Sequence, residues 1–225
     1  MQGDEEGYQE LKQGEQSIRI FFSKDRGLSK SRNLALKNCK ADFGYIMDDD
    51  VVLNEGAIEE IINNMLKENT DIGTAFFTYE DGRLSIPSHK TSFIHNYLTA
   101  AKVASIEICV RIKPIHDKNI SFDEKFGLGT ELPSGEEYIF ITDCLKDNLK
   151  VKYYPVNIGT HPNVTSGQNF YSSPEKTLAK REMLKRIFLW KSPVYILAFW
   201  IKKLPEVIKA GYGFKFTKTM LQGPK

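Results

Sequence analysis

Segments with strand character alternate with segments of helical periodicity over the first third of this 225-residue chain. Residues 17–22, SIRIFF, and residues 72–79, IGTAFFTY, are rich in the β-branched and aromatic side chains that strands favour. Between them we expect one helix over residues 29–39 and a second helix with apolar residues at helical spacing from Ile58 to Leu66. Strands that alternate with helices are typical of an α/β layer fold.

Three consecutive aspartates, Asp48, Asp49 and Asp50, follow the apolar residues 43–47 and stand directly before the second expected helix, for which Asn54 is the expected N-cap. Carboxylates this close repel each other unless a cation or solvent relieves them, so a divalent metal is a natural partner. Open α/β sheets also bind ligands beyond the carboxyl ends of their strands. The alternative is a solvated acidic loop, and the triplet alone leaves both interpretations open.

A glycine turn, a hydroxyl group and two cations come together at the start of the first expected helix, in residues 27–33, GLSKSRN. Ser29 is the expected cap of this helix. Helix N-termini attract phosphate groups because their backbone N–H groups and dipole favour negative charge. Caps and basic helix faces are also common in ordinary structural roles, so this segment alone remains a weak indication of a phosphate-bearing ligand.

Periodicity is weaker in the second half of the chain. Residues 122–133 form a loop in which Gly127 and Gly129 allow tight backbone turns. We expect strands at residues 92–94, 105–112 and 151–158, a short helical stretch over residues 94–103, a helix from Ser134 to about residue 145, and a loop over residues 159–168.

The order of these motifs resembles the family 2 glycosyltransferases of the GT-A fold. In that family a G-x-S-x-[AS]-R-N helix start precedes an acidic metal motif at a strand end, as GLSKSRN precedes FGYIMDDDV here. Residues 122–137 then contain F-D-E, G-x-G and S-G-E-E, similar to the family's F-D-E, G-x-G and S-G-E-D. The resemblance implies a GT-A-like (Rossmann-like) mixed sheet flanked by helices over residues 1–170.

The resemblance also implies roles for the residues of the donor site. Asp50, together with Asp48, would bind Mn²⁺ or Mg²⁺ on the donor diphosphate, and His161 would supply an imidazole to the metal or the diphosphate. The alternative for His161 is an ordinary loop histidine. The residues implied to hold the nucleotide-sugar donor are Arg32, Asn33, Asp48 and Asp49.

Glu137 stands where the family has the aspartate that serves as catalytic base. The extra methylene of Glu leaves Glu136 as an alternative base. Residues 134–137 also match an S-x-x-E capping box, in which Glu137 would only satisfy the Ser134 amide. One base without a covalent nucleophile implies inverting transfer of a sugar, by default from a UDP-sugar, to a glycan or lipid-linked acceptor.

Residues 171–225 are expected to form a helical, basic appendage, whose first helix starts at Ser173 and Pro174. From residue 175 onward there are 12 Lys/Arg and 3 Asp/Glu, a balance of +9, which leaves 19 against 26, or −7, for the rest of the chain. The run VYILAFWI is too short to span a bilayer. With Trp190 and Trp200, it favours a helix at an anionic membrane surface. The alternative is a helix pair packed on the catalytic body with solvated cations.

The chain shows no recognised nucleic-acid module, so we expect no nucleic-acid partner. Its three scattered cysteines and the absence of a signal-like apolar segment at the N-terminus indicate a cytoplasmic protein, and the basic appendage favours a peripheral place at the cytoplasmic face of the membrane. The alternative functions are a metal-dependent nucleotidyltransferase or nucleotide-sugar hydrolase, and a non-catalytic remnant that binds a partner or a membrane.

Members of the family begin with two strands that build the nucleotide pocket, and residues 1–4 resemble only the end of the second strand. We therefore expect a domain that is truncated at its N-terminus and binds nucleotide poorly, unless another segment or the subunit of an oligomer covers the exposed edge.

Overall fold

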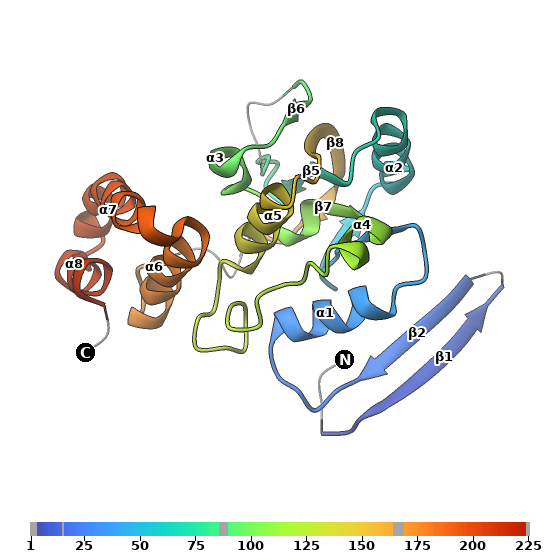
Figure 1. Cartoon of the computed structure of the whole chain (residues 1–225), viewed down its shortest axis with the longest axis horizontal. Helices are drawn as coiled ribbons and strands as arrows, with labels where there is room; N and C mark the ends of the chain where they lie inside the picture. The colour runs from blue at the N-terminus through green and yellow to red at the C-terminus, as the bar shows by residue number, and fades with distance from the viewer. Residues whose placement is uncertain (1–3, 15, 86–89, 164–168, 224–225) are drawn as a thin grey trace. The chain divides into compact units, whose positions relative to one another are not determined.

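A computed structural model describes residues 4–14, 16–85, 90–163 and 169–223. The chain divides into two compact units, and Figure 1 labels their helices and strands. The helical unit consists of Met1–Asn38, Phe122–Glu136 and Phe170–Lys225, and the sheet unit consists of Cys39–Ser121 and Glu137–Asn169.

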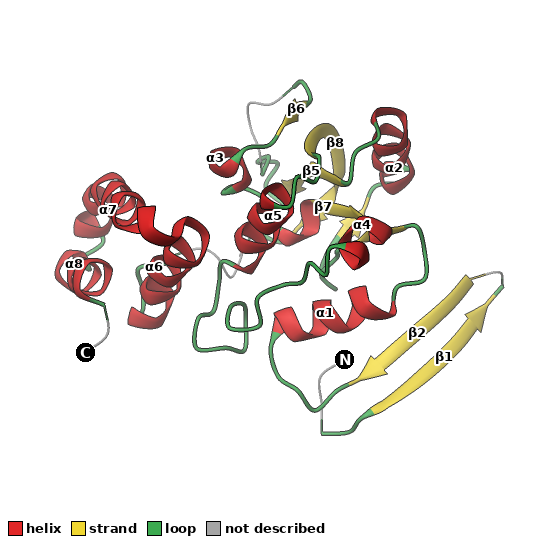
Figure 2. Cartoon of the chain, in the orientation of Figure 1, coloured by secondary structure: helices red, strands yellow, loops and turns green. Residues whose placement is uncertain are grey.

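The sheet unit is built on a six-stranded mixed sheet, drawn in yellow in Figure 2. The strand order is β3-β7-β5-β8-β4, and β6 also pairs with β8. β5 and β8 run parallel, whereas the other pairs are antiparallel. The strands are β3 (Phe43–Tyr45), β4 (Val52–Leu53), β5 (Ile72–Tyr79), β6 (Phe93–Ile94), β7 (Ile108–Arg111) and β8 (Val151–His161).

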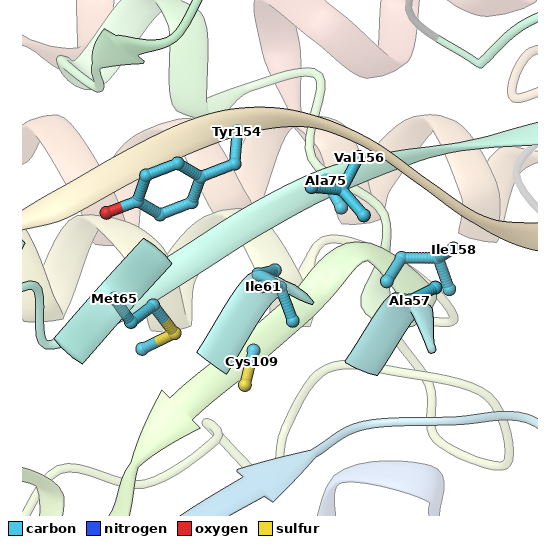
Figure 3. Packing of buried hydrophobic residues seen from close by; sticks show 8 residues of the cluster. All are labelled: Ala57, Ile61, Met65, Ala75, Cys109, Tyr154, Val156 and Ile158. Atoms are coloured by element: carbon cyan, nitrogen blue, oxygen red, sulfur yellow. The ribbon is translucent and has the colours of Figure 1, made fainter. Parts of the chain in front are cut away.

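The core of the sheet unit lies where α2 (Ala57–Glu68) packs on the sheet (Figure 3). The apolar side of the helix presents buried residues every four positions, and each buried side chain of this size stabilises the fold by roughly 1.5–3 kcal/mol. At Gly73 a Cβ atom would lie 2.7 Å from Met65 Sδ, so the helix lies directly on β5 there. The buried cluster contains Ala57, Ile61, Met65, Ala75, Cys109, Tyr154, Val156 and Ile158.

Shorter helices complete this unit. α3 (Tyr97–Ala100) and η1 (Ser105–Glu107) lie between β6 and β7 in the chain, α4 (Ile112–Asp117) directly follows β7, and α5 (Glu136–Lys146) precedes β8. The first residue of α5, Glu136, belongs to the helical unit.

The helical unit contains the antiparallel hairpin of β1 (Gly7–Gln13) and β2 (Gln16–Phe22), followed by α1 (Leu28–Asn38). Its C-terminal part is a group of helices, orange to red in Figure 1, that pack on one another. Ser173 Oγ accepts from the Lys176 backbone N–H and Pro174 occupies the first turn, as predicted. These helices are α6 (Pro174–Phe188), η2 (Leu189–Lys191), α7 (Ser192–Lys209) and α8 (Gly213–Gln222).

Several local expectations are wrong. The opening stretch contains β1, which its polar composition conceals. The expected strand over residues 105–112 is divided into η1, β7 and the start of α4. β8 continues through His161, so this histidine ends a strand and does not lie in a loop. Residues 164–168 of the expected loop lie outside the described residues.

The segment after the aspartates also differs from expectation. α2 begins at Ala57 with Gly56 as its N-cap, at φ 73°, so Asn54 is not the cap. Asn54 instead donates its backbone N–H to the Ile158 carbonyl at 2.9 Å and Nδ2 to the Asn157 carbonyl at 3.0 Å. Strand β4 therefore stands between the aspartates and the helix.

Glu107, which no sequence motif singles out, is buried in the sheet unit. Its Oε1 accepts from Ser85 Oγ at 2.6 Å and its Oε2 from the Ala104 N–H at 3.0 Å. Burial nevertheless raises the pKa of the Glu107 carboxyl to about 7. The pKa of Glu107 is therefore higher in the folded state than in the unfolded state, and the folded state keeps the Glu107 proton at pH values where the unfolded state has lost it. The stability linked to this proton is present at low pH and is lost as pH rises through about 7.

We predict that Glu107→Gln removes this pH dependence. Relative to the variant, the wild type should lose on the order of 3 kcal/mol of unfolding free energy between pH 4.5 and pH 8, since one pKa unit corresponds to about 1.4 kcal/mol. Urea unfolding followed by circular dichroism measures the difference, and Glu59→Gln on the exposed side of α2 is the matched control. Parallel pH profiles for wild type and Glu107→Gln would contradict the assignment.

Candidate functional site

The short strand β4 brings the loop that contains Asp48, Asp49 and Asp50 to the end of β8. Val52 pairs with Thr160, and Leu53 pairs with Gly159. The two backbones approach so closely that a Cβ atom at Gly159 would lie 2.2 Å from the Val52 carbonyl oxygen. The sequence analysis missed this role of Gly159, although an isolated glycine at the end of a strand pattern is a known sign of close backbone approach.

Asp50 and His161 face each other at this end of the sheet. Asp50 Oδ1 lies 3.7 Å from His161 Nε2, and the Asp50 side chain is half exposed whereas that of His161 is largely buried. Asp48 is half-buried and Asp49 exposed in the same loop. The structure therefore brings together Asp50 and His161, two of the residues predicted as metal ligands.

The hydrogen bonding of His161 determines which ring nitrogen faces Asp50 with a lone pair. His161 Nδ1 lies 2.7 Å from the Pro162 carbonyl oxygen, which can only accept, so Nδ1 carries the proton in the neutral ring. Nε2 then presents its lone pair on the side of Asp50. The ring is also held between aromatic neighbours, with centroids 5.4 Å from Phe77 and 6.3 Å from Tyr79. Histidines that bind metals are commonly oriented in this way, by a carbonyl on the other nitrogen.

These atoms fit a shared divalent cation. Carboxylate oxygen and imidazole nitrogen are both ligands of such ions, and two ligands at about 2.1 Å from one ion are separated by at most about 4.2 Å. The distance of 3.7 Å between Asp50 Oδ1 and His161 Nε2 lies within that limit. The described part of the chain holds no group of three or more His, Cys, Asp or Glu side chains suited to a metal. The pair would thus supply two ligands, and phosphate or water oxygens would complete the shell, as is usual for Mg²⁺.

A second cluster of predicted residues lies in the helical unit, where α1 meets the loop of residues 122–136. Arg32 Nη1 lies 3.3 Å from Glu136 Oε1, and both side chains are buried. The Arg32 guanidinium also lies 5.5 Å from the centre of the Phe122 ring. A buried charge is tolerated when it is paired in this way, so Arg32 and Glu136 depend on each other.

Two other polar residues of GLSKSRN, Asn33 and Ser29, hold the same loop. Asn33 Oδ1 accepts from the Phe122 N–H at 2.8 Å, and Asn33 Nδ2 donates to the Phe122 carbonyl at 2.9 Å and to Glu124 Oε1 at 3.0 Å. Ser29 lies inside the first turn of α1 and donates Oγ to the Phe126 carbonyl at 2.6 Å, so the expected N-cap role is wrong. The sequence contained a signal for these contacts, namely the joint presence of GLSKSRN and the F-D-E segment.

The glycines of this loop allow the close approach. Gly127 has φ 106°, and a Cβ atom there would lie 3.0 Å from Ser29 Oγ and 3.2 Å from Glu136 Cδ. Gly135 has φ 109°, and its Cβ would lie 2.7 Å from Met183 Sδ of α6. A side chain at either position would be strained and would collide with its neighbours. The tight turns expected at Gly127 and Gly129 are therefore confirmed, since Gly129 has φ 84°, and a similar turn occurs at Gly135.

The two candidate bases occupy different environments. Glu136 is 3% exposed and its carboxylate is paired with Arg32. Glu137, the next residue of α5, is only half-buried.

A sequence profile decides the family. The profile described as Glycosyl transferase family 2 matches residues 2–117, which is 116 of the 225 residues. The chain belongs to glycosyl transferase family 2. A search of curated proteins finds no match to this family 2 chain.

Solved structures confirm the GT-A-like α/β fold of this family 2 chain. S. aureus TarS 1-349, crystallised in complex with UDP, is 20% identical with a TM-score of 0.51, and the match covers 74% of this chain and 47% of that one. S. aureus TarS is 18% identical with a TM-score of 0.50 over 88% of this chain and 37% of that one. The chain thus spans less than half the length of these two structures.

We predict that Gly159→Ala separates Asp50 from His161. The new methyl group must displace β4, because the atoms in its way belong to the Val52 and Leu53 backbone. Affinity for Mn²⁺, measured by calorimetry, should fall about tenfold or more, as it does when the support of a metal ligand is lost. Gly7→Ala is the control, because its Cβ would meet only Phe22 at 3.7 Å. Unchanged Mn²⁺ affinity in folded Gly159→Ala would contradict the prediction.

We further predict that removing one member of the Arg32–Glu136 pair lowers the unfolding free energy more than removing both. Arg32→Met should lower the unfolding free energy by about 3–5 kcal/mol, because it leaves the Glu136 charge buried. Adding Glu136→Leu should restore most of this loss. Urea unfolding followed by tryptophan fluorescence reports on the helical unit, which contains both tryptophans. Additive losses in the double variant would argue against a coupled pair.

Proposed function

We propose that this glycosyltransferase transfers a sugar from a UDP-sugar to a hydroxyl group of a glycan or lipid-linked acceptor, with inversion at the sugar carbon. The observation that carries the proposal is the Asp50–His161 pair at the end of β8, which offers a carboxylate oxygen and an imidazole lone pair to the same position. Membership of the family supports glycosyl transfer, and the UDP in the TarS 1-349 crystal supports a uridine nucleotide as donor.

Asp50 and His161 would hold Mn²⁺ or Mg²⁺ against the donor diphosphate. When bound, such an ion is a Lewis acid that stabilises the negative charge of the departing diphosphate. Asp48 and Asp49, which lie in the same loop, are proposed to contact the nucleotide-sugar. For Arg32 and Asn33 we propose an indirect role, because their polar atoms bond the loop of residues 122–136.

Glu137 is the proposed general base. Its carboxylate would take the proton of the acceptor hydroxyl while the hydroxyl oxygen bonds to the anomeric carbon and the bond from that carbon to the diphosphate breaks. A single displacement of this kind inverts the configuration and releases UDP. Glu136 is less suited to the role, because burial and the Arg32 charge hold its carboxylate inside the helical unit.

Loss of the base should slow turnover without loss of donor binding. We predict that Glu137→Gln lowers kcat for UDP release by roughly 10²–10⁴-fold, with little change in KM for the UDP-sugar. Asp50→Asn should instead raise the Mn²⁺ concentration required for activity. Glu131→Gln is the matched control, because Glu131 is exposed and lies in the loop of residues 122–136.

The same assay separates the alternatives. UDP release that continues at the same rate without acceptor would indicate a nucleotide-sugar hydrolase, and release of a nucleoside monophosphate would point to a different bond being cleaved. No release with any UDP- or GDP-sugar would leave a non-catalytic binding protein. Full activity of Glu137→Gln would exclude Glu137 as the base.

We also propose that the reaction takes place at the cytoplasmic face of a membrane, where a lipid-linked acceptor is accessible. No helix in the described part of the chain is long and apolar enough to cross a bilayer. The excess of 12 Lys/Arg over 3 Asp/Glu from residue 175 onward supports contact with an anionic surface.

A further inference from the structure

One side of α7 is apolar and exposed to solvent. Val194, Leu197, Ile201 and Ile208 are spaced by three, four and seven residues, so they share one side of the helix. They are 70%, 47%, 57% and 59% exposed. The opposite side of α7 packs inside the helical unit, where Trp200 Nε1 donates to Thr217 Oγ1 of α8 at 3.0 Å.

The exposed apolar surface continues onto neighbouring residues. Trp190, in η2 just before α7, is 82% exposed, and Phe214 in the first turn of α8 is 83% exposed. We refer to these exposed residues together as the α7 apolar face, which consists of Trp190, Val194, Leu197, Ile201, Ile208 and Phe214. A groove of about 480 Å³ lies beside the α7 apolar face and is lined by Leu204, Ile208, Gly211, Gly213, Phe214 and Thr217.

Lysines border the α7 apolar face in a regular way. In four places an exposed lysine directly follows a residue of the face: Trp190-Lys191, Ile201-Lys202, Ile208-Lys209 and Phe214-Lys215. Lys191 Nζ also lies 5.2 Å from the centre of the Trp190 ring. From residue 189 to residue 222 there are six lysines and one acidic residue, Glu206, which Lys203 contacts at 2.8 Å.

We propose that the α7 apolar face binds the surface of an anionic lipid bilayer. Apolar side chains of an interfacial helix enter the boundary between headgroups and acyl chains, while the lysines beside them contact anionic headgroups. The exposed tryptophan suits the same boundary, because its ring is apolar and its N–H is polar. The charge pattern selects this occupant over a second copy of the chain, since an isologous contact would bring the lysine rows of two copies together.

The inference names the surface by which the proposed enzyme would reach a lipid-linked acceptor, and in that respect it rests on the proposed function. Binding to lipid requires no donor, metal or turnover. It can therefore be measured on its own, and either proposal can fail without the other.

The test is co-sedimentation of the full chain with vesicles of phosphatidylcholine alone or mixed with phosphatidylglycerol. We expect binding only to the anionic vesicles, with loss of binding at high salt as screening shortens the range of the lysine charges. The double variant Ile201→Ser, Lys202→Glu should partition at least about tenfold more weakly. The matched control is Leu66→Ser, Lys67→Glu, an exposed pair of the same kind on α2 of the sheet unit.

Tryptophan fluorescence gives a residue-level readout. Anionic vesicles should shift the emission of the wild type to shorter wavelength, and Trp190→Phe should remove most of the shift while sedimentation remains. Equal binding to both vesicle types, equal weakening by the α2 control, or no binding at all would overturn the proposal. So would a concentration-dependent dimer, seen by analytical ultracentrifugation, that the Ile201→Ser, Lys202→Glu variant abolishes, because a second copy would then cover the face.

Discussion

The parallel pairing of β5 with β8 is the contact on which the candidate site depends. It aligns Tyr79 with His161 at the ends of the two strands, and the aromatic ring of Tyr79 supports the imidazole. The antiparallel addition of β4 to the same end of β8 then brings Asp50 near. Neither contact is local in sequence. Tyr79 lies about eighty residues before His161, and Asp50 lies more than a hundred residues before it. Gly159 allows the second contact because it leaves room for the Val52 carbonyl oxygen.

The helical unit depends on a different kind of interaction, a charge pair removed from water. Arg32 and Glu136 come from segments far apart in the chain, and each would be costly to bury alone. Ser29 and Asn33 add hydrogen bonds from the same helix to the same loop. The polar residues of GLSKSRN thus hold the loop of residues 122–136, and the direct contact with donor that the resemblance implies stays a prediction.

Local pattern was enough to predict α2, β5 and the start of α6, because α2 has strong periodicity, β5 is rich in β-branched and aromatic residues and α6 has a clear cap. The expected bounds of α1 were correct to within one residue, although its expected cap, Ser29, lies inside the helix. The pattern failed where tertiary contacts override local preference. Val52 and Leu53 form a strand only because β8 provides a partner, and Asn54 is used there and is unavailable as a cap. The predicted pairing of Asp50 with His161 came from the resemblance, because spacing alone cannot place residues from distant strands. The exposure of the α7 apolar face was likewise beyond the sequence, which shows a helix's apolar residues without showing which of them are covered.

Glu136 and Glu137 differ in their surroundings at the start of α5. Consecutive side chains of an α-helix point about 100° apart. The Glu136 carboxylate is buried and paired with Arg32, whereas Glu137 is half-buried. A general base needs a carboxylate that can reach the substrate, and the Glu136 carboxylate is buried against Arg32. The buried ion pair therefore favours Glu137 over Glu136 as the base of the proposed reaction.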